Sequence, residues 1–164
     1  MDMALLSKTW AEAGWDPGPA AERLEAVLPG AVLETVVFRG ERTLVVDVEQ
    51  VVDALAFLRD DADLQFDFLT DVTAVHWPGR SEPFDVVYHL YSFPRNVRLR
   101  VKARLGEGPA IPTVVPLWPA AGWLERECFD MFGIVFEGHP DLRRILMPED
   151  FEGHPLRKEF PLKC

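Results

Sequence analysis

The sequence predicts an α+β domain of two layers, followed by a C-terminal helix and an extended tail. Helical and strand-like periodicities alternate in the order helix, two strands, helix, three strands, and prolines interrupt the last 27 residues. Helices covering one face of a mixed or antiparallel sheet are the natural packing for that order. We expect an α+β domain at 1–117, a connecting helix at 118–137 and an extended partner-binding tail at 138–164.

Helical periodicity occurs first in residues 3–15, which end at the breaker "DPGP", and again in residues 20–28, which end at "PG". Two apolar runs follow, "AVLETVVF" and "RTLVVDV", with Arg-Gly-Glu between them. This pattern is typical of a β-hairpin, and we expect its turn at Gly40.

Residues 49–61 return to the helical period and place apolar side chains on one face. Three β-rich runs come next, at 66–77, 84–93 and 96–105. The last alternates strictly between apolar residues and the basic residues Arg98, Arg100, Lys102 and Arg104. One face of that strand should therefore be solvated or meet an acidic partner. A final helix is expected at 120–132, and Gly133 should open the tail.

The composition is that of a folded protein, with 164 residues, 48% hydrophobic and 27% charged. Seventeen basic and 27 acidic residues give a net charge of −10. That charge argues against binding nucleic acid and against docking unaided on an anionic membrane. We find no signal-peptide pattern, no membrane-spanning run and too few cysteines for a disulfide framework. We therefore expect a cytosolic chain that does not insert into the membrane.

Motifs for redox or nucleotide chemistry are missing from the sequence. It has no P-loop, no GxGxxG after a strand and no set of four thiolates for an iron–sulfur cluster. The four histidines are His76, His89, His139 and His154. No carboxylates or cysteines stand at ligand spacing from them, so we expect no metal, flavin or cluster in this chain.

Cys128 is the candidate nucleophile, but it lies among carboxylates that would raise the pKa of its thiol. Glu125 and Glu127 could serve as acid and base, yet residues two apart on a helix do not face each other. We therefore expect no catalytic residue. A free-standing enzyme that uses Cys128, His139 or His154 is the remote alternative.

The tail is too apolar for an ordinary chain end. The segment "GHPDLRRILMPEDFEGHPLRKEFPL" repeats Gly-His-Pro fifteen positions apart and carries both signs of charge. Burying one large apolar side chain is worth about 1.5–3 kcal/mol, so several left in water would form a binding surface. The tail could wrap its own domain or bind a partner. We expect a partner, with the basic residues pairing partner carboxylates and the apolar residues filling pockets.

Residues 125–162 closely resemble the signature of the thirty-kilodalton subunit of respiratory complex I, which in bacteria is the C subunit of the NADH:quinone oxidoreductase. The blocks "ERE" and "DMF" fit position by position, as do His139, Arg143 and Ile145. The resemblance implies a structural subunit of the peripheral arm, on the cytoplasmic side of the plasma membrane. It also implies that FMN, iron–sulfur clusters and quinone belong to neighbouring subunits.

The resemblance further implies that the tail packs against the large quinone-site subunit and iron–sulfur subunits. The expected interface residues are Glu125, Arg126, Glu127, Asp130, His139, Asp141, Leu142, Arg143, Arg144, Ile145, Phe151, His154, Arg157, Lys158 and Phe160. The equivalent subunit of a membrane-bound hydrogenase, or of a dehydrogenase with another electron donor, remains an alternative.

Overall fold

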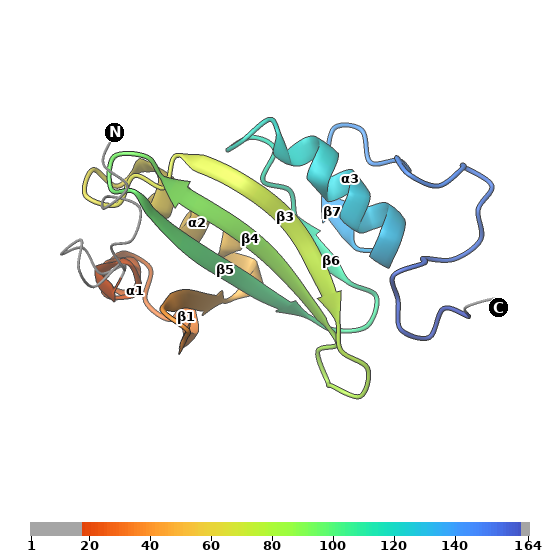
Figure 1. Ribbon diagram of the computed structural model, residues 1–164, viewed down its shortest axis with the longest axis horizontal. Coiled ribbons are helices and arrows are strands. Elements are labelled where there is room, and N and C mark those ends of the chain that lie inside the picture. Colours follow the sequence, from red (N-terminus) through yellow and green to blue (C-terminus); the bar gives the residue numbers. More distant parts are fainter. Residues whose placement is uncertain (1–17, 162–164) are drawn as a thin grey trace, which may run out of the picture.

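A computed structural model describes residues 18–161, and Figure 1 shows its helices, strands and C-terminal tail. The helices are α1 (Gly18–Val27), α2 (Val51–Asp60) and α3 (Ala121–Phe132), with a 3-10 turn, η2, at Val48–Gln50. The strands are β1 (Val32–Phe38), β2 (Glu41–Val46), β3 (Phe68–His76), β4 (Phe84–Ser92), β5 (Val97–Leu105), β6 (Ala110–Pro112) and β7 (Val135–Glu137).

The first five strands form one mixed sheet in the order β1-β2-β5-β4-β3. Neighbouring strands are antiparallel except β2 and β5, which run parallel and are joined by a long connection through α2, β3 and β4. The hairpin between β1 and β2 turns at Arg39 and Gly40, whose φ angles of 51° and 80° suit a two-residue type I′ turn. The predicted hairpin and its turn are confirmed.

All three helices belong to the layer on one face of this sheet. Tyr88, Val101 and Leu44 line that face, and they form one cluster with Leu24 of α1, Leu55 of α2 and buried residues of α3. Figure 1 shows α1 and α2 near the β1 side of the sheet, and α3 with the tail near β3. The two-layer α+β prediction is confirmed.

The other face of the sheet carries the basic residues of β5. Arg100 pairs with Glu41 at 2.5 Å and Arg104 pairs with Glu34 at 2.6 Å. Lys102 lies 3.5 Å from Asp85. Acidic residues on β1, β2 and β4 of the same sheet therefore supply partners for three of these cations.

Two short strands were not expected from the sequence. β6 and β7 form a separate parallel pair, in stretches that were predicted to be irregular or helical. Three residues are too few for a periodicity to show. The helix expected at 3–15 lies outside the described residues, while those expected at 20–28, 49–61 and 120–132 correspond to α1, α2 and α3.

Between residues 18 and 161, every helix is too short or too polar to cross a lipid bilayer.

We predict that truncating two leucines of the same hairpin has very different effects on stability. Leu44 is fully buried, so Leu44→Ala should lower the free energy of unfolding by about 2–5 kcal/mol, measured by chemical denaturation. Leu33 is 58% exposed, so Leu33→Ala should change it by no more than about 0.5 kcal/mol. Equal losses would contradict the assignment of the core to one face of the sheet.

Candidate functional site

The candidate site is the contact between α3 and the tail, residues 138–161. α3 divides into two faces because residues three or four apart share one side of a helix. Its core face carries Ala121, Glu125, Cys128 and Phe132, all of which are buried. Its other face presents Gly122, Arg126 and Asp130, at intervals of four residues, and all three contact the tail.

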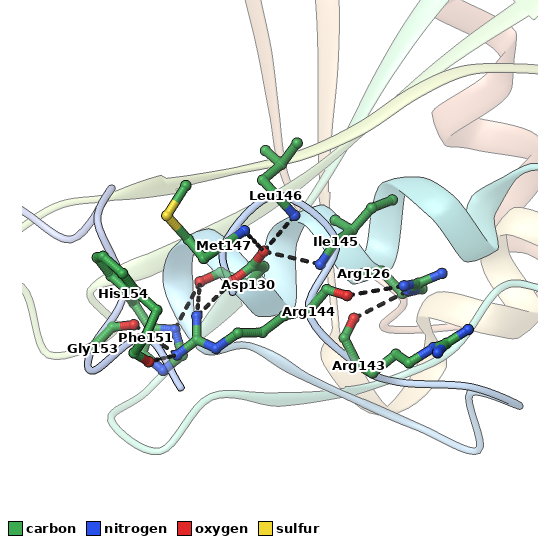
Figure 2. Close-up of polar contacts among 10 residues, drawn as sticks. All are labelled: Arg126, Asp130, Arg143, Arg144, Ile145, Leu146, Met147, Phe151, Gly153 and His154. Atoms are coloured by element: carbon green, nitrogen blue, oxygen red, sulfur yellow. Dashed lines mark hydrogen bonds and ion pairs between the residues drawn. The ribbon is translucent and has the colours of Figure 1, made fainter. Parts of the chain in front are cut away.

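Asp130 organises the contact, and Figure 2 shows the groups that converge on it. One carboxylate oxygen, Oδ2, accepts hydrogen bonds from the backbone N–H groups of Ile145, Leu146 and Met147 at 3.0, 2.7 and 2.8 Å. The other oxygen, Oδ1, accepts from Arg144 Nη1 at 2.5 Å. A fully buried carboxylate thus holds four consecutive residues of the tail.

The pKa of Asp130 reports this arrangement. Burial by itself would raise the pKa of the carboxyl group, because it penalises the charged form. The backbone N–H of Met147, the Arg144 guanidinium and the N–H groups of Ile145 and Leu146 outweigh burial and lower the pKa from 3.8 to about 2. The carboxylate is therefore charged at neutral pH, and that charge stabilises the folded tail.

Arg144 connects Asp130 to the second half of the tail. Its Nη2 donates to the carbonyl oxygens of Phe151 and Gly153 at 2.8 and 3.0 Å (Figure 2). Its side chain is only 15% exposed. Arg144 was expected to pair with a carboxylate of a partner, but here it pairs with Asp130 of its own chain. Its bonds to Phe151 and Gly153 fold the tail back on itself.

The tail also caps the C-terminal end of α3. An α-helix leaves its last four carbonyl oxygens without a donor from the helix itself. Gly133, the residue after the helix, donates its N–H to Phe129 at 2.8 Å. The tail supplies the other three donors: His154 Nδ1 to Asp130 at 2.9 Å, Leu156 N–H to Met131 at 3.0 Å and Arg157 Nε to Phe132 at 2.6 Å. Cations at this end also offset the negative end of the helix dipole.

The two Gly-His-Pro copies fasten opposite ends of the same helix. His139 Nε2 donates to the carbonyl oxygen of Gly122 in the first turn at 3.0 Å, while its Nδ1 accepts from the N–H of Asp141. His154 binds the last turn through its other ring nitrogen, Nδ1, which lies 2.9 Å from the carbonyl oxygen of Asp130. Gly138 and Gly153, which precede the two histidines, have φ angles of 80° and 87° that favour glycine. The repeat is therefore one anchor used twice.

Arg126 fixes the tail between these anchors. Its Nε and Nη2 donate to the carbonyl oxygens of Arg143 and Arg144 at 3.1 and 2.9 Å.

On the core face, Glu125 accepts from the Thr113 hydroxyl and the Val114 N–H at 2.5 and 2.7 Å. Burial raises the pKa of Glu125, and these hydrogen bonds oppose that rise.

Gly133 allows the tail to approach α3 closely. It ends the helix with φ of 74°, in the left-handed region. A Cβ at this position would lie 2.6 Å from His154 Nε2 and 2.9 Å from Arg157 Nη2. Sequence reasoning placed Gly133 at the helix end but missed this second role, because the close approach involves residues more than twenty positions away.

The remaining expected interface residues differ in exposure. Leu142, Ile145, Phe151 and Phe160 are half-buried, and Phe151 and Phe160 stack with ring centroids 5.9 Å apart. The exposed members are Glu127, Asp141, Arg143 and Lys158. Leu146 and Leu156, which were left out of the expected interface, are 56% and 49% exposed. Only the folded tail shows which of its leucines face outward.

The residues considered for catalysis or metal binding are otherwise engaged. Burial raises the pKa of the Cys128 thiol far above its ordinary value, and Glu127, Asp71 and Glu125 raise it further. The Nδ1 of His76 accepts from the Lys158 N–H at 3.0 Å. Within the described part of the chain, no three His, Cys, Asp or Glu side chains are grouped to hold a metal ion.

Replacing Asp130 by asparagine should release the tail. Removing one partner of a buried ion pair costs about 3–5 kcal/mol, so the free energy of opening the tail should fall by that amount in Asp130→Asn. Amide hydrogen exchange at Leu146 measures this quantity. Asp141→Asn is the matched control, because the Asp141–Arg143 pair is exposed and should contribute at most about 1 kcal/mol.

The tail should also open in acid. The folded-state pKa of Asp130, about 2, lies below its ordinary value of 3.8, so its stabilisation is present above that value and is lost as the pH falls towards 2. The raised pKa of Glu125 has the opposite effect on the pH dependence: its contribution lowers the stability as the pH rises, so it does not contribute to opening in acid. Cleavage of the tail by an acid protease should increase between these pH values. In the Asp130→Asn variant, which lacks this carboxyl group, cleavage of the tail should not increase over the same pH range.

Comparison with known proteins agrees with the resemblance at 125–162. The family model described as the 30 Kd subunit of the respiratory-chain NADH dehydrogenase matches residues 44–164. The NADH-quinone oxidoreductase C subunit of Roseiflexus sp. (strain RS-1) is 51% identical over 148 residues, which are 90% of this chain and 85% of that protein. The corresponding protein of Rhodobacter capsulatus is 53% identical over 133 residues, or 81% and 67% of the two chains.

A solved structure gives the same result for the fold. One chain of the membrane-bound sulfane sulfur reductase, an archaeal respiratory membrane complex, superposes with a TM-score of 0.73 at 27% identity. The match covers 88% of this chain and 85% of that chain. The resemblance inferred from the sequence is confirmed: the chain belongs to the family of the 30 Kd subunit of the respiratory-chain NADH dehydrogenase, whose bacterial members include the C subunit of NADH-quinone oxidoreductase.

Proposed function

We propose that this chain is a structural, non-redox subunit of the peripheral arm of a proton-translocating NADH:quinone oxidoreductase. It lies on the cytoplasmic side of the plasma membrane, and FMN, the iron–sulfur clusters and quinone are held by its neighbours. Family membership supports this assignment. The engagement of Cys128, His139 and His154 within the fold is consistent with a chain that performs no chemistry of its own.

The tail is the surface that we assign to the quinone-site subunit. One observation carries this step: the tail is hydrogen-bonded to α3 through Asp130, yet Leu146 and Leu156 remain about half exposed. Fixing a segment before it binds reduces the ordering cost of association. Exposed apolar side chains on a fixed backbone are the usual anchors of an interface, and Arg143 and Lys158 supply charges nearby in the sequence.

A second candidate is favoured by the similarity to the sulfane sulfur reductase complex. This chain would then be the equivalent subunit of a related membrane-bound complex with a different electron donor. The 51% identity to an NADH-quinone oxidoreductase subunit over 90% of the chain favours the first candidate. The proteins that purify with the tagged chain from native membranes distinguish the two, since only the first includes an NADH-binding flavin subunit.

The double substitution Leu146→Ser and Leu156→Ser should impair assembly without unfolding the chain. If these leucines are anchors, their loss should weaken assembly by about 2 kcal/mol or more, roughly a 30-fold change in the affinity constant. Native gels of solubilised membranes and recovery of the quinone-site subunit with the tagged chain would measure the effect.

Val27→Ser is the matched control, because Val27 is 58% exposed but belongs to α1, at the other end of the molecule (Figure 1). It should leave assembly unchanged. Full recovery of the quinone-site subunit with the double variant would contradict the proposal that Leu146 and Leu156 bind that subunit. A wild-type chain that purifies from membranes without any respiratory subunit would contradict the proposed function itself.

A further inference from the structure

Strand β1 exposes apolar side chains on both faces of the sheet. Leu33, Val36, Val37 and Phe38 are 58%, 38%, 60% and 67% exposed. Successive residues of a strand point to opposite faces, so β1 exposes apolar side chains both on the face that helices cover elsewhere in the sheet and on the other face. Exposed apolar residues that gather on one element indicate a site of contact with another molecule.

Among residues 18–161, β1 is an edge strand of the sheet. Within that range it pairs with β2 alone and lies at the opposite margin from β3 (Figure 1). Proteins usually blunt an edge strand with lysine, proline, short length or a bulge. The sequence of β1, "VLETVVF", has seven residues and contains neither lysine nor proline. A register irregularity occurs only at its start, between Val32 and Glu34.

The backbone of β1 offers a row of hydrogen-bonding groups to a further strand. In a hairpin closed by a two-residue type I′ turn, the closing pair, here Phe38 and Glu41, exchanges hydrogen bonds, and the pattern then alternates along the strand. Thr35 and Val37 consequently direct their N–H and C=O groups away from β2. Among residues 18–161, no backbone group outside β2 bonds to them.

We propose that β1 is completed by an extended, apolar segment of a neighbouring subunit, which adds to the sheet as a sixth strand. The inference rests on the proposed function, because it requires that the chain is assembled with other subunits. An edge strand is complementary to another extended backbone, whereas a helix has already satisfied its own backbone groups. Because both faces of β1 are apolar, the added strand carries apolar side chains on both of its faces.

The net charge of this chain favours a segment of another protein over a second copy of this chain. Glu34 and Glu41 are paired with Arg104 and Arg100 at 2.6 and 2.5 Å, so the acidic residues of the hairpin are neutralised within the sheet. Two copies of this chain would each bring a net charge of −10 to the contact, and the two charges would repel.

Amide hydrogen exchange tests the proposal on the full chain, alone and in the complex purified from membranes. In the isolated chain, the N–H groups of Thr35 and Val37 should exchange fast, and those of Val36 and Phe38 should exchange slowly. In the complex, Thr35 and Val37 should also become slow. If they exchange as fast in the complex as in the isolated chain, no strand is added and the proposal is wrong.

The variant Thr35→Pro removes one outward N–H without removing a bond to β2. Recovery of the chain with the complex should fall by at least about tenfold, while Thr35→Val, which keeps the N–H, should behave as the wild type. If Thr35→Pro does not fold, the exchange measurement still decides. Recovery of folded Thr35→Pro at the wild-type level would also overturn the proposal.

Two further outcomes would assign the edge to a different occupant and so overturn the proposal. Slow exchange of Thr35 in the isolated monomer would indicate a segment of the same chain, and a concentration-dependent dimer with slow exchange would indicate a second copy. Failure of the proposed function looks different. If the proposed function is wrong, the chain does not purify with a respiratory complex at all. If only the proposal about β1 is wrong, the chain purifies with the complex but the exchange at Thr35 and Val37 remains fast.

Discussion

The tail of this protein depends on a single buried carboxylate. Asp130 is charged at neutral pH although it is fully buried, because three consecutive backbone N–H groups and Arg144 surround it. A buried charge without such partners would be costly, so tail and helix stabilise each other. His154, Leu156 and Arg157 add further bonds from the tail to the last turn of α3.

This arrangement explains how a segment interrupted by prolines can serve as a binding surface. Polar groups of the tail bond to α3, to β3 and to one another, and Leu142 and Met147 pack against the core. Leu146 and Leu156 remain outside. The tail therefore has an inner side that belongs to this chain and an outer side available to a partner. β1 contrasts with it, because β1 exposes apolar side chains on both faces and a backbone edge that bonds to no other strand among residues 18–161.

Much of the fold could be predicted from periodicity. The hairpin, the helices of residues 18–161 and the alternating strand β5 were found because each has a repeat of two or about 3.6 residues. β6 and β7 were missed, since three residues show no period. The direction of β2 relative to β5 was left open, because the chain between them can cross the sheet in more than one way.

The sequence by itself determined the longer helices and strands and the family, because these depend on local pattern and on a long, specific motif. Only the tertiary structure decided which tail residues face inward. Arg143 and Arg144 are adjacent and chemically identical, yet one is exposed and the other binds Asp130. The difference comes from the packing of the tail across α3, which joins residues fourteen or more positions apart and which no local pattern records.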